Sequence, residues 1–291
     1  MALHAPLAFS ILGSGSSGNS SFVTASGLGI LVDAGLSARE TGRRMHSLGH
    51  SLDDVDVLLL THEHHDHIKG LEALSKARKL TVVATAGTLR AVAGLLHAQT
   101  ECWELRPGAE RDLGGVTVRG FPTAHDAAGP MGYVLAAGGA SLGYVTDFGQ
   151  PDEALAEAVA EVDALVIESN HDLGMLRDGP YPWPLKQRIL AETGHCSNED
   201  LAEFLREAEL GRCRSLTLAH LSRTNNRPEL AMAAATAALA GRPLAKALKL
   251  AHHDRAGAME AVHAQSTATA PRAQLAPRVP AQLRLAFGGE N

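Results

Sequence analysis

Cysteine, long apolar runs and excess charge are all scarce in this chain of 291 residues. Three cysteines in so long a chain argue against a disulfide framework. No apolar run reaches the length of about 18 residues that a membrane-spanning helix needs. Residues 1–6 lack the positively charged start of a secretory signal peptide. We therefore expect a cytoplasmic protein with no membrane association.

The charge balance excludes a strong overall attraction to nucleic acid. The net charge is −6, so attraction to a phosphate backbone requires a local basic groove. Hydrophobic residues make up 45% and charged residues 20% of the chain. These values are ordinary for a globular protein, and they exclude a mainly disordered chain, a collagen-like repeat and a coiled coil.

Patterns typical of strands and helices alternate along residues 1–254. Runs at residues 7–12, 20–25 and 56–60 predict strands, and apolar residues at helical spacing predict the helices between later strands. No break typical of a linker interrupts the pattern, so we predict one α/β domain over residues 1–254. Residues 255–291 are rich in Ala, Pro and Arg, which predicts a flexible tail because they cannot bury enough apolar surface.

The fifteen histidines are unusual in number, and several of them gather in the segment THEHHDH, residues 61–67. This segment follows a predicted buried strand and precedes a predicted helix. His62, His64, Asp66 and His67 can therefore converge on one point. Imidazoles and a carboxylate suit zinc or manganese. The alternative, a solvated loop that is rich in histidine by accident, explains the position at a strand-to-helix junction poorly.

Three more candidate metal ligands follow predicted strands: His125, Asp147 and His220. Each is a weak signal by itself, since a single histidine after a strand is usually a surface or core residue. Their shared position strengthens the signal, because strand ends at one edge of a sheet face one crevice. The full set exceeds the four ligands of a single site, which favours two metals.

The ordered series H-x-H-x-D-H, His, Asp, His resembles the metallo-β-lactamase-fold hydrolases. It is still more similar to the YycJ/WalJ branch of cytoplasmic metal-dependent nucleases within that superfamily. The resemblance covers about residues 7–252. The motifs that carry it are residues 13–19, 31–37, 61–70, 146–147, 168–172, 179–184 and 219–222.

This resemblance implies an αβ/βα four-layer sandwich with two divalent metal ions, zinc or manganese, at one edge. It assigns His62, His64 and His125 to one metal, and Asp66, His67 and His220 to the other. Asp147 would bridge the two, and Asp66 would also count as a catalytic residue. Two ions about 3.5–4 Å apart can hold an attacking hydroxide and stabilise charge on a phosphate. No cysteine stands at a ligand position, which disfavours the lactamase variants that use a thiolate.

Glu168 and His195 bear on the substrate class. A carboxylate that orients an imidazole can make it a proton donor to a leaving alkoxide. The phosphodiesterase branches of the superfamily carry a similar Glu and a similar Gly-His segment. The alternative is that Glu168 caps a helix and His195 is an ordinary loop residue. Cys196 stands where an aliphatic residue is expected, which puts the local packing in question.

Residues 13–18 formally match the dinucleotide-binding fingerprint G-x-G-x-x-G, and Asp33 follows at a suitable distance. That fingerprint needs a helix to begin at the last glycine. Residues 20–25 instead have the composition of a strand. We expect the loop to line the metal crevice, where its N–H groups can meet a phosphate, and Asp33 to hold a metal-bound histidine from behind. The histidines left without a role, which we expect to be solvated or capping, are His65, His171, His252 and His253.

The sequence thus favours a dinuclear metal-dependent phosphodiesterase, most simply a DNA exonuclease acting in DNA repair. The choice of DNA over RNA as the nucleic-acid substrate rests on the resemblance alone. A thioesterase-like hydrolase on the same fold is one alternative, against which the Glu168–His195 pair weighs. A non-catalytic, metal-stabilised scaffold is another, against which the complete ligand set weighs.

The C-terminal tail carries the segment QLRLAF at residues 282–287. Gln282, Leu283, Leu285 and Phe287 resemble the short peptides by which bacterial polymerases and repair proteins dock on the sliding clamp. A glutamine at a pocket rim, apolar side chains to fill the pocket and a free tether are what such docking needs. The alternative is an amphipathic segment without a partner. We predict the sliding clamp as a partner of the tail.

Overall fold

Two seven-stranded sheets form the centre of the molecule. The computed structural model describes residues 6–264. The strand orders are β14-β1-β2-β3-β4-β5-β6 and β13-β12-β11-β10-β9-β8-β7. The strands of the first sheet are β1 (Ala8–Gly13), β2 (Ser20–Ala25), β3 (Leu28–Val32), β4 (Val57–Leu59), β5 (Thr81–Ala84), β6 (Glu101–Glu104) and β14 (Glu260–Ala261). Those of the second are β7 (Glu110–Asp112), β8 (Thr117–Pro122), β9 (Met131–Ala137), β10 (Ala140–Val145), β11 (Ala164–Glu168), β12 (Ser215–Ala219) and β13 (Leu248–Leu250).

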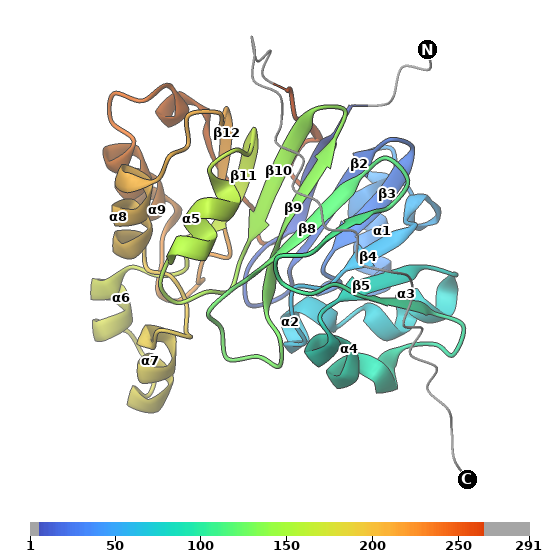
Figure 1. Ribbon diagram of the computed structural model, residues 1–291. Coiled ribbons are helices and arrows are strands. Elements are labelled where there is room, and N and C mark those ends of the chain that lie inside the picture. Colours follow the sequence, from blue (N-terminus) through green and yellow to red (C-terminus); the bar gives the residue numbers. More distant parts are fainter. Residues whose placement is uncertain (1–5, 265–291) are drawn as a thin grey trace.

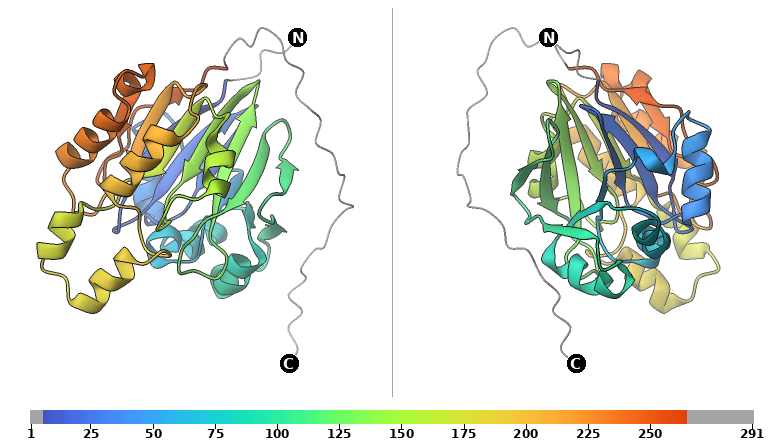
Figure 2. Two further views of the ribbon diagram at one scale, coloured as in Figure 1. Left: turned by 60° about the vertical axis from the view of Figure 1, so that its left-hand side comes forward. Right: turned by 90° about the vertical axis from the view of Figure 1, so that its right-hand side faces the viewer.

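Helices cover the outer faces of both sheets, so the molecule has the four layers expected of an αβ/βα sandwich (Figure 1). The first sheet carries α1 (Ala38–His46), α2 (His65–Ile68), α3 (Leu71–Ala77) and α4 (Ala86–Val92). The second sheet carries α5 (Glu153–Val159), α8 (Asn198–Glu207) and α9 (Pro228–Ala238), with α6 (Leu173–Asp178) and α7 (Trp183–Leu190) beyond its end. The two halves of the fold lie face to face in the turned views (Figure 2).

Strands β3 and β4 are apolar on both faces because each sheet is buried on both sides. In β3, Ile30 and Val32 point into the core between the sheets, while Leu31 points into the core under α1, α3 and α4. In β4, Leu58 faces those helices and Leu59 faces the other sheet. Successive side chains on a strand point to opposite faces, so a sheet buried on both sides needs a nearly continuous apolar run.

The apolar residues at helical spacing between residues 68 and 77 belong to two helices and not to one. Gly70 separates α2 from α3 and forms the N-cap of α3. A Cβ at Gly70 would lie 2.1 Å from the backbone oxygen of Leu36, so only glycine permits this close crossing of two chain segments. The close crossing lets α2 lie against the segment after β3, where the N–H group of Ala34 donates to the carbonyl oxygen of His67.

The packed chain extends past residue 254, where the sequence pattern places the end of the domain. Ala261 pairs with Ala8 and Glu260 with Phe9, so β14 adds an edge strand to the first sheet. Val262 is buried in the core between the sheets. The tail motif with Gln282, Leu283, Leu285 and Phe287 lies outside the described residues. Over residues 6–264, no helix is long and apolar enough to span a bilayer.

Candidate metal centre and catalytic pair

All the candidate ligands lie at one edge of the sandwich, in the loops after β4, β8, β10 and β12 and, for Asp66 and His67, in the short helix α2. Asp33 (φ 62°) and His220 (φ 53°) directly follow β3 and β12, and Asp147 (φ 61°) lies two residues after the end of β10. A left-handed backbone is uncommon for residues other than glycine and is found most often at functional sites. Here it turns the chain sharply near each strand end, which brings Asp147 and His220 to the crevice and Asp33 behind His67.

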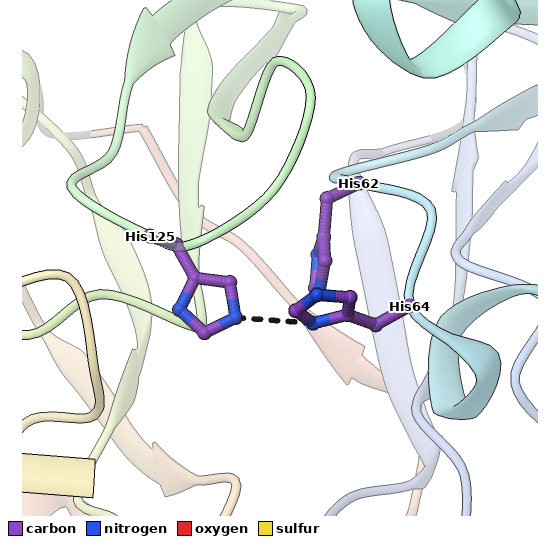
Figure 3. A group of neighbouring side chains, drawn as sticks. All are labelled: His62, His64 and His125. Carbon is purple, nitrogen blue, oxygen red and sulfur yellow. Dashed lines mark hydrogen bonds between the residues drawn. The ribbon is translucent and has the colours of Figure 1, made fainter. Parts of the chain in front are cut away.

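His62, His64 and His125 form the first group, and they come from two segments on opposite sides of the crevice (Figure 3). One ligand atom from each lies within 4.8 Å of the others. Nε2 of His125 is 3.2 Å from Nδ1 of His64. The carbonyl oxygen of Gly194 can only accept, so Nδ1 of His125, 2.9 Å away, donates to it. This bond leaves the Nε2 lone pair of His125 free for a metal.

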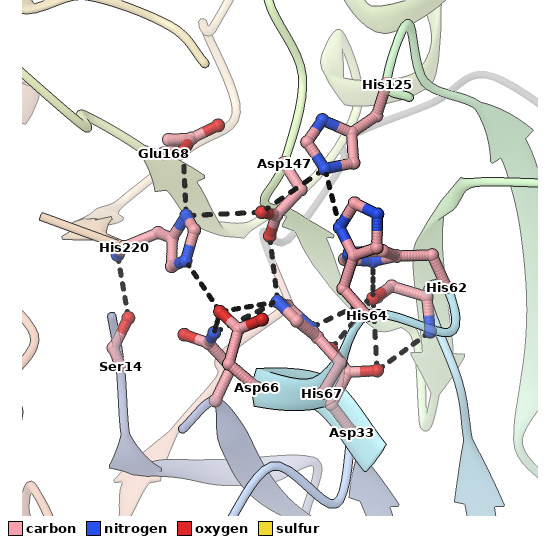
Figure 4. A network of polar contacts seen from close by, with 12 residues as sticks. Ser14, Asp33, His62, His64, Asp66, His67, His125, Asp147, Glu168 and His220 are labelled. Atoms are coloured by element: carbon pink, nitrogen blue, oxygen red, sulfur yellow. Dashed lines mark hydrogen bonds and ion pairs between the residues drawn. The ribbon is translucent and has the colours of Figure 1, made fainter. Parts of the chain in front are cut away.

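Asp66, His67 and His220 form the second group (Figure 4). Oδ2 of Asp66 lies 3.7 Å from Nε2 of His67 and 3.6 Å from Nε2 of His220. Carboxylates fix both rings from behind: Nδ1 of His67 donates to Asp33 at 2.8 Å, and Nδ1 of His220 donates to Glu168 at 2.8 Å. Asp33 therefore lies where the sequence predicts it, behind a candidate metal ligand.

Asp147 faces both groups. Its Oδ2 is 3.2 Å from Nε2 of His67, and its Oδ1 is 3.8 Å from Nε2 of His125. The carboxylate is almost fully buried between the rings. One carboxylate with an oxygen toward each group is the arrangement that a bridging ligand requires.

The donor set fits divalent metal ions. Nε2 of His62 and Nε2 of His220 are buried, and neither has a hydrogen-bond partner among the residues that the structure describes. Thr61 donates its hydroxyl proton to Asp33, so it accepts from Nδ1 of His62 at 3.0 Å. The Nε2 atoms of His62, His67, His125 and His220 therefore all point inward. Buried imidazole nitrogens and carboxylate oxygens gathered in this way suit a divalent ion such as zinc or manganese.

The charges in the crevice also favour a cation. Burial raises the pKa of Asp147, but His220 and His67 outweigh it and hold that pKa well below its ordinary value. Burial lowers the pKa of His67, yet Asp147 and Asp33 outweigh it and raise the pKa to about 10. Burial and the neighbouring His67 keep the pKa of His62 well below its ordinary value. The carboxylates thus stabilise positive charge at the point that both ligand groups face.

Glu168 and His195 are in direct contact beside the ligand groups. Nδ1 of His195 donates to Oε1 of Glu168 at 2.9 Å. Glu168 is fully buried, while the His195 side chain is 23% exposed. Burial lowers the pKa of His195, but the Glu168 carboxylate outweighs it and raises that pKa. The N–H group of Phe148 donates to Oε2 of Glu168, so Glu168 bonds a loop and two histidines and does not cap a helix.

The Gly/Ser loop of residues 13–19 contributes side chains that the motif search did not single out. The N–H group of His220 donates to the Ser14 hydroxyl at 2.7 Å, and Nδ2 of Asn19 donates to Oδ2 of Asp66 at 3.2 Å. The loop therefore borders the second ligand group. Residues 20–25 form β2 and not a helix, which excludes the dinucleotide fingerprint.

Two expectations about individual residues change. The expectation of a solvated or capping histidine is wrong for His171, which is 1% exposed and has no hydrogen-bond partner on its ring within residues 6–264. Cys196 is fully buried in the core between the second sheet and its helices, so a thiol fills the place of an aliphatic side chain without disturbing the packing.

A four-layer sandwich with His/Asp clusters at one edge defines a metal-dependent hydrolase with the metallo-β-lactamase fold. Residues 29–221 match the beta-lactamase superfamily domain. The chain belongs to this superfamily and, within it, to the YycJ/WalJ-type family.

The relatives span most of the chain. It is 38% identical to the exodeoxyribonuclease YycJ of Bacillus anthracis, over 79% of this chain and 87% of that protein. It is 37% identical to the exodeoxyribonuclease WalJ of Streptococcus pneumoniae, over 77% of this chain and 84% of that protein. The metallo-β-lactamase fold protein YhfI from Bacillus subtilis has a similar fold, with a TM-score of 0.69 over 87% of this chain and 100% of that chain at 16% identity.

Proposed function

We propose that this hydrolase is a dinuclear, metal-dependent phosphodiesterase that degrades DNA from an end. The observation that carries the proposal is the Glu168–His195 pair next to the two ligand groups, because hydrolysis of a phosphodiester must protonate a leaving alkoxide. The two exodeoxyribonucleases to which the chain is similar support DNA as the substrate.

We assign the ligands as two sets that share Asp147. His62, His64 and His125 hold one divalent ion, and Asp66, His67 and His220 hold the other. Ions held in this way lower the pKa of water and stabilise negative charge on a phosphoryl group. Asp33 and Glu168 keep His67 and His220 in the tautomer that presents Nε2.

His195 acts as the general acid in this proposal. Because Nδ1 donates to Glu168, the remaining nitrogen Nε2 is the one that can deliver a proton to the leaving oxygen. The Glu168 carboxylate raises the pKa of His195 and so stabilises the protonated ring that a general acid needs. A thioesterase has a better leaving group and needs no such acid, so the pair favours the phosphodiesterase over the thioesterase-like alternative. A non-catalytic scaffold has no need of the acid or of a complete ligand set.

The test is a product assay with purified protein. Duplex and single-stranded DNA labelled at the 5′ or the 3′ end, labelled RNA and a model thioester are each supplied with manganese or zinc. Stepwise shortening of DNA from one end is the expected result. Cleavage of RNA alone, or of the thioester alone, contradicts the proposal.

DNA repair is the cellular role we propose, in the cytoplasm where bacterial chromosomal DNA lies. The exonucleolytic removal of a damaged strand is a step that repair requires. The proposed catalytic domain spans residues 1–254, with its packing extended by β14. Loss of the enzyme is expected to raise the mutation frequency, and reintroduction of the His195→Ala variant should not restore it.

The sliding clamp is the partner we propose for the segment with Gln282, Leu283, Leu285 and Phe287, on the sequence pattern alone. Deletion of residues 281–291 should leave the nuclease rate on short DNA unchanged and abolish co-elution with the clamp. Retained clamp binding by the truncated protein, or no binding by the full chain, contradicts this partner.

A further inference from the structure

A cavity of about 220 Å³ is lined by the segments that flank the second ligand group in the sequence. Polar and cationic side chains dominate its wall: Ser17, Ser37, Lys69, Arg223 and His253. These residues come from the Gly/Ser loop, the start of α1, the end of α2, the loop after β12 and the segment after β13. The candidate ligands and the catalytic pair use none of them.

The same segments carry the ligands of the second group. Lys69 follows Asp66 by three residues at the end of α2, and Arg223 follows His220 by three residues. The ring of His253 packs on Gly15, where a Cβ would lie 2.3 Å from Nδ1, so glycine is required for this wall of the cavity. The cavity is therefore within a short reach of the place where a phosphodiester would be cleaved.

The charge that remains available in this cavity is positive. Over residues 6–264, the side chains of Lys69 and Arg223 form no hydrogen bond or ion pair. Glu40 also lines the cavity, but its oxygens are bound by Arg43 and Arg44 at 2.6–2.8 Å. Asp254 is the remaining carboxylate of the lining. Within the described residues, the unpaired charges of the lining are therefore two cations, Lys69 and Arg223, and one carboxylate, Asp254.

The neutral groups of the wall are hydrogen-bond donors. The Ser37 hydroxyl already accepts from the N–H group of Glu40 at 3.2 Å, so its own proton is free to donate outward. Ser37 is also the N-cap of α1, where the helix dipole favours an anion. Free ammonium, guanidinium and hydroxyl groups around one small space match a tetrahedral oxyanion.

We propose that this cavity binds a phosphate group of the nucleic-acid chain next to the phosphodiester that is cleaved, with Lys69 and Arg223 as its charged contacts. The proposal rests on the proposed nuclease function. A phosphate bound there is a second point of contact between enzyme and substrate, on the side of Asp66 and His220. This contact sets how far the nucleic acid advances before each cleavage.

The test measures DNA affinity, salt dependence and substrate preference. In holoenzyme carrying His195→Ala, which should bind without cutting, Lys69→Ala and Arg223→Ala should each raise the Kd for DNA about tenfold. Each should also lower the slope of log Kd against log salt by about one. In the catalytically intact protein, the same substitutions should reduce the turnover of DNA more than that of bis(p-nitrophenyl) phosphate, which is too short to fill the cavity.

Matched controls separate this site from a general charge effect. Lys79→Ala and Arg206→Ala remove the same charge from exposed positions that do not line the cavity, and they should leave DNA affinity near the unaltered value. DNA ending in a phosphate and DNA ending in a hydroxyl distinguish a terminal phosphate from an internal one as the group bound. Equal losses with the control variants, or equal losses on both substrates, overturn the proposal.

A further measurement distinguishes failure of the phosphate-binding proposal from failure of the proposed nuclease function. Inorganic phosphate should raise the Tm of the holoenzyme, and it should raise the Tm of Lys69→Ala and Arg223→Ala less. A protein that cuts no DNA but shows this difference refutes the nuclease function and keeps an anion site. A protein that cuts DNA but shows neither this difference nor a change in Kd refutes the cavity alone.

Discussion

Glu168 accepts a hydrogen bond from Nδ1 of His220 at 2.8 Å, with the same Oε1 atom that accepts one from Nδ1 of His195 at 2.9 Å. One fully buried carboxylate therefore orients a proposed metal ligand and the proposed general acid together. Burial raises the pKa of Glu168, but the two histidines outweigh it and hold that pKa at about 2. The metal centre and the proton donor are thus parts of one hydrogen-bonded unit.

Glu168→Gln should therefore impair two properties at once. The amide keeps the shape of the side chain but removes the charge that holds both rings, so metal occupancy should fall along with activity. Elemental analysis and a DNA assay measure the two. His195→Ala is the matched comparison, because it should lose activity and keep its metal. Full metal content in Glu168→Gln would contradict the shared role.

His195→Ala should reduce the turnover of DNA by about two to four orders of magnitude, the range expected for loss of a general acid. A substrate with a p-nitrophenolate leaving group needs no proton, so its turnover should fall far less. The rates on both substrates, measured on the same preparation, give the comparison. An equal loss on both would assign His195 a structural role.

Asp147→Ala should release both metal ions, because its carboxylate faces both ligand groups. His64→Ala removes a ligand of the first group only, so it should release one ion and keep the other. Metal-to-protein ratios after gel filtration measure the difference. Full activity of the unaltered protein with one ion per chain would refute the two-metal assignment.

Much of the site could be predicted because its residues lie where strands end. A buried strand is visible in the sequence as an apolar run. The polar residues that follow the run can therefore be assigned to the end of that strand. The sequence therefore indicates His125, Asp147 and His220 as residues that lie after strands at one edge of the sheet. The second contact of Glu168, with His220, spans 52 residues of sequence. No local pattern encodes it, since it arises only when β11 and β12 pair side by side.

The edge strands β6, β7 and β14 have no recognisable strand pattern in the sequence, for a physical reason. β6 is ECWE and β7 is ERD, and both are partly exposed. An edge strand buries little surface, so it needs no apolar alternation, and charged side chains there discourage pairing with other chains. The two-residue strand β14 is too short for any periodicity to be visible in the sequence.

Asp33→Asn should weaken metal binding by about 10- to 100-fold, the usual cost of removing a carboxylate behind a metal-bound histidine. The substitution keeps the size of the side chain but weakens its bond to His67. Titration of metal-free protein with zinc or manganese measures the change. Asp53→Asn is the control, because Asp53 is exposed and contacts none of the candidate ligands. Equal metal affinity in the two variants would show that Asp33 serves folding alone.

Val262→Ala should lower the free energy of unfolding by about 1–3 kcal/mol, as expected when a buried side chain is truncated. Val262 is 5% exposed and packs between the sheets, and its N–H group donates to the carbonyl oxygen of Leu7. His263→Ala, at the exposed neighbouring position, should have almost no effect. Urea unfolding of both variants gives the comparison. Equal stability of Val262→Ala and the unaltered protein would mean that the domain does not depend on β14, and that its energetic boundary lies at residue 254 after all.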